Sequence, residues 1–306
     1  MTTAHTIANP SPMGDVVSRL RDYYSLTKPE VNLLILITTS AGYYLGSDRP
    51  FKVGAFVSTL LGTLLVASGT ATLNQLMERH HDARMRRTAG RPLASGRLTA
   101  PAAAWFGFLL SAAGGLYLAK TVNGLSALLA IFTLLAYLLV YTPLKRITSL
   151  CTVLGAIPGA APTLIGWAGA TDRIDPQAWV LFAILFLWQF PHFLAIALLY
   201  RDDYARAGFR MLPRFDSDGR FTRSEIVAFT IVLVLATMLP FAGHGGAAYL
   251  LCMFVAGVFL LYHATKLTRS PSKALASRVV HASVIHLPIV LGVMVTSKAL
   301  NYALKG

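Results

Sequence analysis

Residues 178–200 read AWVLFAILFLWQFPHFLAIALLY, and this stretch contains no Asp, Glu, Lys or Arg. A helix of ~20 apolar residues is long enough to cross the hydrocarbon core of a bilayer. Comparable apolar stretches run over residues 31–46, 53–76, 101–119, 123–142, 150–169, 225–243, 247–263 and 281–301. The sequence therefore predicts an all-α polytopic membrane protein with about nine transmembrane helices.

The composition supports a membrane protein over a soluble one. Of the 306 residues, 55% are hydrophobic and 13% are charged, whereas a soluble domain has ~25% charged residues. We expect residues 31–306 to form a single membrane-embedded domain, preceded by a cytoplasmic segment, residues 1–30, without the pattern of a removable signal peptide. Cys151 and Cys252 are far apart in apolar sequence, which indicates no disulfide framework.

The net charge of +14 is explained by membrane topology. If the N-terminus is cytoplasmic, 21 of the 27 Lys and Arg residues fall in cytoplasmic segments and six in external ones. This distribution follows the positive-inside rule. It predicts a multi-pass protein of the cell inner membrane with an external C-terminus, whose partner is the lipid bilayer and not a nucleic acid.

Two of the basic segments, residues 77–100 and 201–224, resemble each other. Each contains six arginines, and they close on GRLT and GRFT. The similarity suggests an internal duplication in which two helical halves meet at a shared site. Coincidence between two basic loops is the alternative.

A ladder of polar residues ends the second apolar stretch. Asn74, Glu78 and Asp82 are spaced four residues apart, so they share one helix face over ~12 Å. Carboxylate and amide oxygens suit Mg²⁺, which usually binds through one or two carboxylates plus substrate phosphates. Arg87 and Arg91 follow, and Arg offers bidentate geometry to phosphate. A surface salt-bridge network is the alternative interpretation.

Further charged residues lie on the same predicted membrane side. Lys145 and Arg146 in YTPLKR are placed to bind a leaving diphosphate, and Lys28 adds a cation or serves as a positive-inside anchor. Asp202 and Asp203 end the sixth apolar stretch as acids end the second. The predicted catalytic residues are Asn74, Glu78, Asp82, Asp202 and Asp203, and the predicted metal ligands are Asn74, Glu78, Asp82 and Asp203.

These motifs resemble those of the intramembrane prenyltransferase superfamily and, within it, of the protohaem IX farnesyltransferases. The motifs are LTKPEVN, N-x-x-x-E-x-x-x-D, R-x-x-G-R-P-L-x-S-G-R, YTPLKR and WQFPHFLAIALLYRDDYARAG, and the likeness spans nearly the whole chain. The resemblance implies a bundle of about nine helices around a central cavity. It also implies Mg²⁺-assisted transfer of the farnesyl group of farnesyl diphosphate to a vinyl group of haem B, with water completing haem O.

The acceptor haem B would need contacts that the resemblance leaves open. An ionisable residue within a membrane helix is a functional hypothesis by default, and His192 is such a residue. The candidate haem-binding residues are His192, Trp188, Tyr200, Tyr204 and His286. A haem A synthase is a candidate downstream partner.

The sequence departs from the common superfamily pattern N-D-x-x-D-x-x-x-D. Gln75 and Glu78 stand at two of its acidic positions, and Tyr200 and Tyr204 align with Asp of the second motif. These departures leave the number of metal ions open. Two other functions also remain open. One is a prenyltransferase acting on another aromatic ring, and the other is a transporter, favoured by the possible duplication and by a helix broken at Pro158 and Pro162.

Overall fold

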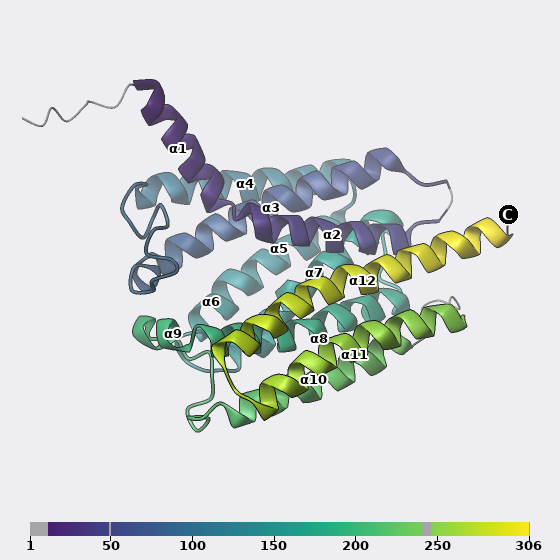
Figure 1. Ribbon diagram of the computed structural model, residues 1–306. Coiled ribbons are helices and arrows are strands. Elements are labelled where there is room, and N and C mark those ends of the chain that lie inside the picture. The colour runs from purple at the N-terminus through teal and green to yellow at the C-terminus, as the bar shows by residue number, and fades with distance from the viewer. Residues whose placement is uncertain (1–11, 49, 240–245, 306) are drawn as a thin grey trace, which may run out of the picture.

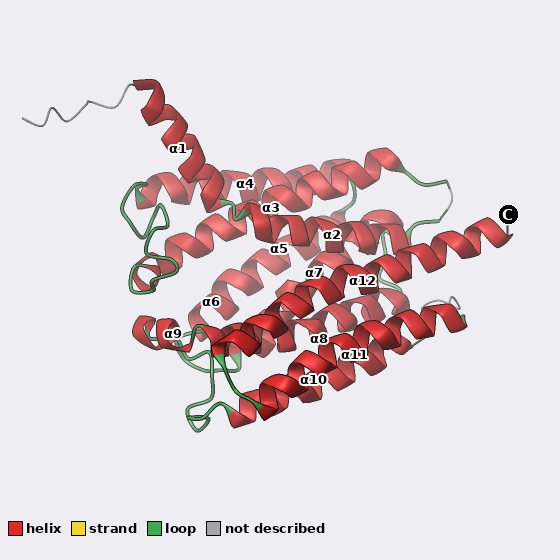
Figure 2. Ribbon diagram, in the orientation of Figure 1, coloured by secondary structure: helices red, strands yellow, loops and turns green. Residues whose placement is uncertain are grey.

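The computed structural model describes residues 12–48, 50–239 and 246–305, and every regular element within them is a helix (Figure 2). The elements are α1 (Pro12–Leu26), α2 (Pro29–Gly46), α3 (Val53–Asp82), α4 (Ala100–Thr121), α5 (Gly124–Leu135), the π-helical turn η1 (Ala136–Tyr141), α6 (Thr142–Leu144), α7 (Cys151–Thr171), α8 (Pro176–Leu199), α9 (Arg201–Ala207), α10 (Arg220–Met238), α11 (Ala247–Arg269) and α12 (Lys273–Lys305).

The long helices run side by side as one bundle, with loops gathered at its two ends (Figure 1). Within the described residues, eight helical runs are long and apolar enough to cross a membrane. The predicted all-α, multi-pass membrane fold is therefore confirmed. The remaining predicted span is α2, a helix of 18 residues that is not among the eight, so the count of nine stays a prediction.

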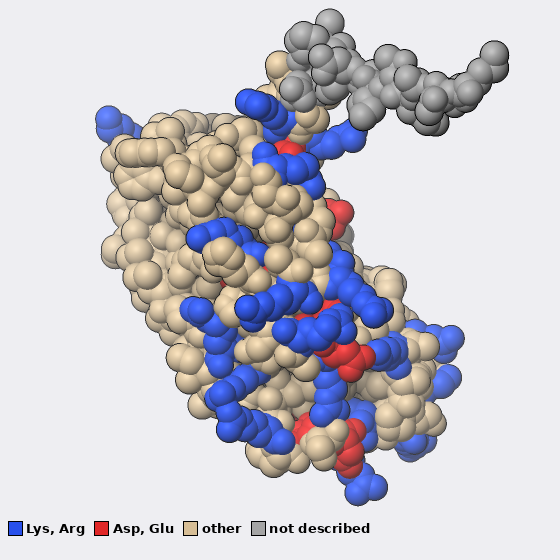
Figure 3. Space-filling view, turned by 90° about the vertical axis from the view of Figure 1, so that its left-hand side faces the viewer, with Lys and Arg blue, Asp and Glu red and all other residues tan. Residues whose placement is uncertain are grey.

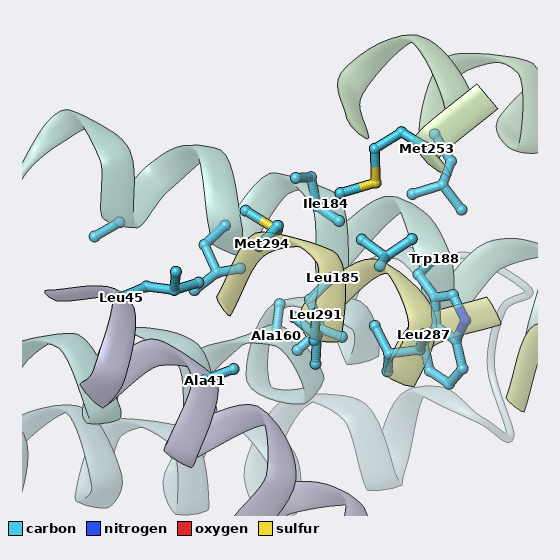
Figure 4. Packing of buried hydrophobic residues seen from close by; sticks show 14 of the residues in the cluster. Ala41, Leu45, Ala160, Ile184, Leu185, Trp188, Met253, Leu287, Leu291 and Met294 are labelled. Carbon is cyan, nitrogen blue, oxygen red and sulfur yellow. The ribbon is translucent and has the colours of Figure 1, made fainter. Parts of the chain in front are cut away.

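The surface of the bundle is apolar where lipid would contact it. Trp105 and Leu128 are each 66% exposed, and many other large apolar side chains point outward. Exposed apolar surface of this extent marks an interface, which for helices of this length is the bilayer. Inside, a cluster that includes Leu185, Trp188 and Leu291 joins α2, α7, α8, α11 and α12 (Figure 4).

Helix α7 lies inside the bundle and packs closely against α2. A side chain at Gly166 would overlap the Thr39 carbonyl oxygen, and one at Gly42 would overlap the Thr163 carbonyl oxygen. Small residues permit this approach of two backbones, which is how membrane helices commonly associate. The helix continues through Pro158.

The basic loops predicted to be cytoplasmic lie at one end of the bundle, on the left in Figure 1. Lys and Arg side chains cover much of that end, with acidic side chains among them (Figure 3).

The two free cysteines differ in environment, since Cys151 is buried and Cys252 is exposed. The helices α1 and α9 were not anticipated, and α3 continues six residues beyond the apolar stretch that predicted it.

Candidate active site

A cavity of about 280 Å³ opens near the basic end and is enclosed by α2, α3, α5, α7 and α8. Its walls are mostly apolar, and Lys28 and Tyr141 line its rim. Ligand sites typically measure ~300–1,000 Å³. This cavity therefore suits one elongated apolar group better than two large substrates at once.

The predicted ladder on α3 lies at this rim, and a cation from another segment holds each of its members. The contacts are Lys28 Nζ to Asn74 Oδ1 (2.9 Å), Lys145 Nζ to Glu78 Oε1 (2.8 Å) and Arg91 Nη1 to Asp82 Oδ2 (2.8 Å). The structure thus brings together six of the residues that the sequence analysis selected.

The side chains that accept in these contacts are buried. Asn74 is 1% exposed, Glu78 5% and Asp82 1%. Two of the contacts are ion pairs, as the salt-bridge interpretation expects, but their carboxylates are not in water as those of a surface network would be. The oxygen Oδ1 of Asp82 is buried and has no hydrogen-bond partner among the described residues. An unpaired buried carboxylate oxygen is costly unless another group binds to it.

The donor set fits Mg²⁺ held jointly with a diphosphate. No group of three or more His, Cys, Asp or Glu side chains in the described chain forms a metal cage. Mg²⁺ seldom needs such a cage because it keeps water and phosphate ligands. Asn74, Glu78 and Asp82 would supply the protein oxygens.

Lys28 is held in an uncommon state. Its backbone adopts a left-handed conformation, with φ of 52°, at the residue that precedes α2, which is costly for a residue with a Cβ. Burial lowers the pKa of Lys28 to about 7, with Arg91 and Lys145 adding to this effect and nearby carboxylates opposing it. An arriving anion would favour the protonated form.

The sequence analysis missed Tyr137 and Tyr141, which line the cavity next to Lys145. The ring centroids of the two tyrosines are 4.9 Å apart, and Lys145 Nζ lies 4.4 Å from the centre of the Tyr141 ring. The spacing of four residues between Tyr137, Tyr141 and Lys145 is a signal that could have found them. Pro143 follows the π-helical turn η1, and π-helical turns are frequent at functional sites.

The second predicted acidic cluster does not join the ladder. Asp203 pairs with Arg206 of its own helix α9, and the exposed Asp202 receives a 2.7 Å hydrogen bond from Lys273 Nζ. Arg146 is exposed in the loop after α6. Among the described residues, no hydrogen bond or ion pair of the Arg146 side chain is seen.

Helix α9 nevertheless lies beside the inner end of α3. His81 Nδ1 is 2.8 Å from the Ala207 carbonyl oxygen. Arg87 donates to the Tyr204 hydroxyl at 3.4 Å, and its guanidinium lies 4.9 Å from the centre of the Tyr200 ring. These contacts join the two loops that resemble each other in sequence.

Three of the haem candidates, Trp188, His192 and His286, lie on α8 and α12 and make no contact with the ladder among the described residues. Trp188 lines the cavity, and His192 stacks on it with ring centroids 4.8 Å apart. Ser283 of α12 accepts from Trp188 Nε1 through its carbonyl oxygen (2.7 Å) and contacts His192 Nδ1 through its hydroxyl (2.8 Å). His286 is 1% exposed, and neither ring nitrogen has a hydrogen-bond partner within the described chain.

Comparison with solved structures shows the same fold. A structure reported for digeranylgeranylglyceryl phosphate synthase superposes with a TM-score of 0.75 at 18% identity, covering 92% of this chain and 98% of that one. A UbiA homologue from Archaeoglobus fulgidus, bound to GPP and Mg²⁺, gives a TM-score of 0.62 at 15% identity, covering 89% and 99%.

Comparison with curated sequences identifies closer relatives. A protoheme IX farnesyltransferase of Solibacter usitatus is 45% identical over 91% of this chain and 99% of its own length. A protoheme IX farnesyltransferase of Koribacter versatilis is 41% identical over 94% of this chain and 97% of its own length. The sequence pattern of the UbiA prenyltransferase family matches residues 35–285. The polar ladder on α3, the cavity beneath it and these matches together show that the chain belongs to the UbiA prenyltransferase family.

Proposed function

We propose that the protein transfers the farnesyl group of farnesyl diphosphate to a vinyl group of haem B, giving haem O and diphosphate. The observation that carries this proposal is a row of one buried amide and two buried carboxylates, each paired with a cation, at the rim of an apolar cavity. Relatives at 45% and 41% identity are named protoheme IX farnesyltransferases, and a homologue of the same fold binds GPP and Mg²⁺.

In this proposal, Lys28, Arg91 and Lys145 turn from the ladder to the diphosphate oxygens when the donor binds. A bound Mg²⁺ would add positive charge where the leaving group develops negative charge. The cations do the same from the protein side, which favours cleavage of the bond between the first farnesyl carbon and oxygen. Asn74, Glu78 and Asp82 would hold the metal.

The cavity protects the farnesyl cation from water until the vinyl group captures it. The terminal vinyl carbon forms the new carbon–carbon bond, and the cation then sits beside the porphyrin. Water adds its oxygen there and releases a proton, which leaves a hydroxyl group. Tyr137 and Tyr141 line the cavity next to Lys145, where the electron-rich faces of aromatic rings would favour a cation.

For the acceptor, we propose that His192 and Trp188 contact the porphyrin from the α8 side. Tyr200 and Tyr204 lie near the rim with Arg87, where cations would attract the haem propionates. His286 is a candidate whose ring nitrogens have no hydrogen-bond partner among the described residues. The haem product would then pass to an enzyme of the haem A synthase type.

Expression in cells that make haem B tests the function. Extracted pigments are expected to contain a haem heavier by a farnesyl group plus one water. Purified protein should also release diphosphate from farnesyl diphosphate in the presence of haem B. A carrier would show neither product nor release, and a prenyltransferase for another ring would release diphosphate only with that ring.

The topology gives a separate prediction. We propose nine membrane spans, with α2 as the first, a cytoplasmic N-terminus and an external C-terminus in the cell inner membrane, because the basic loops share one end of the bundle. A reporter fused after Arg87 or after Arg214 is expected to give a cytoplasmic signal, and one after Lys305 an external signal. Reversed signals would overturn the orientation.

A further inference from the structure

The cavity is long and follows α3 away from the rim. Its lining on this helix passes through Ala71 and Ala67 to Thr63. The rise from Asn74 at the rim to Thr63 is ~16 Å along the helix axis. Small side chains at positions 67 and 71 leave the space open along this length. A farnesyl chain in extended form has a comparable length.

Three nearly buried side chains line the far end of the cavity. Thr38 is 2% exposed, Thr63 3% and Ile165 2%, and they come from α2, α3 and α7. They form a floor at the depth where the lining ends. We use the term floor for these three residues.

Close helix packing seals the space beyond the floor. A side chain at Gly169 of α7 would come within 2.6 Å of the Thr59 hydroxyl of α3. One turn earlier, Gly166 lies against the Thr39 carbonyl of α2. A longer apolar chain would therefore have to separate backbones that are already in contact, which close-packed interiors resist.

We infer that the floor limits the length of the prenyl chain that fits the cavity. Thr38, Thr63 and Ile165 thereby set the preference for a farnesyl donor. A shorter geranyl chain leaves the end of the cavity unfilled and loses apolar burial. A longer geranylgeranyl chain meets the floor and cannot bring its diphosphate to the cations at the rim. This inference rests on the proposed function and adds the residues that set its donor specificity.

Two substitutions should move the preference in opposite directions. Ala67→Leu fills the cavity ~10 Å below Asn74. The affinity for farnesyl diphosphate should therefore fall at least about tenfold relative to that for geranyl diphosphate, since even one methylene in an apolar pocket changes affinity by about tenfold or more. Ile165→Ala removes part of the floor, so geranylgeranyl diphosphate should gain about tenfold relative to farnesyl diphosphate. Ala113→Leu, at an exposed position of α4, is the matched control and should retain the wild-type order.

The measurement is the dissociation constant of each of the three diphosphates in purified full-length protein, together with diphosphate release in the presence of haem B. Monodispersity and thermal unfolding check the fold, and Ala67→Val replaces Ala67→Leu if the latter does not fold. If both folded variants keep turnover and bind the three diphosphates in the wild-type order of affinity, the role of the floor is overturned and the proposed function is not. Absence of binding and release for all three donors in the wild-type protein would overturn the proposed function with it.

Discussion

Replacement of Glu78 by Gln is expected to lower the rate of farnesyl transfer by about a hundredfold or more, the size of effect seen when one preorganised electrostatic group is removed. Gln keeps the size and hydrogen bonding of Glu78 but removes its charge. Affinity for Mg²⁺ in the presence of farnesyl diphosphate should fall, and raised Mg²⁺ should recover part of the turnover. Both quantities can be measured across one Mg²⁺ titration.

Two further variants control this experiment. Asp82→Asn should act in the same direction, because its carboxylate has a buried oxygen without a partner among the described residues. Asp22→Asn removes a carboxylate from a partly exposed pair with Arg97, away from the ladder, so it should cost about 1 kcal/mol of stability and leave turnover intact. Near-native turnover of Glu78→Gln and Asp82→Asn at limiting Mg²⁺ would eliminate the metal–diphosphate site.

The helices were predictable because the signal for a membrane helix is local. Each apolar stretch carries its own length and hydropathy, and the structure has a helix or helical run at each one. The ends were less predictable where a helix leaves the apolar region. Residues 77–82 of α3 are MERHHD, a polar sequence that hydropathy does not identify as part of a membrane helix. The ladder nevertheless extends through this segment to Asp82.

The cations that contact the ladder could be selected from the sequence, but the sequence did not show which cation contacts which member of the ladder. Lys28 lies 46 residues from Asn74 and Lys145 lies 67 residues from Glu78, and such contacts depend on how α2, α3 and the α6–α7 loop assemble. Asp203 was selected by analogy with the first loop. In the structure it lies in the separate helix α9, paired with a neighbour there.

Replacement of Lys145 by Met is expected to raise the dissociation constant of farnesyl diphosphate about ten- to a hundredfold, because one charge-assisted contact at a buried site contributes ~1.5–3 kcal/mol. The Lys145 ammonium donates to Glu78 at 2.8 Å and lies over the Tyr141 ring. Met keeps most of the length of the side chain and removes the ammonium, with its charge and its hydrogen-bond donors. Binding of the intact donor, without haem B, isolates this step from turnover.

The double variant Glu78→Gln with Lys145→Met separates diphosphate binding from ion pairing. Each single variant leaves one buried charge without its partner, which costs on the order of 3 kcal/mol of stability. The double variant removes both charges, so its unfolding temperature should return toward that of the wild-type protein. Its affinity for farnesyl diphosphate should remain low, since the cation is still missing. If the double variant instead binds the donor as tightly as the wild-type protein, Lys145 serves to neutralise Glu78 and does not bind the diphosphate.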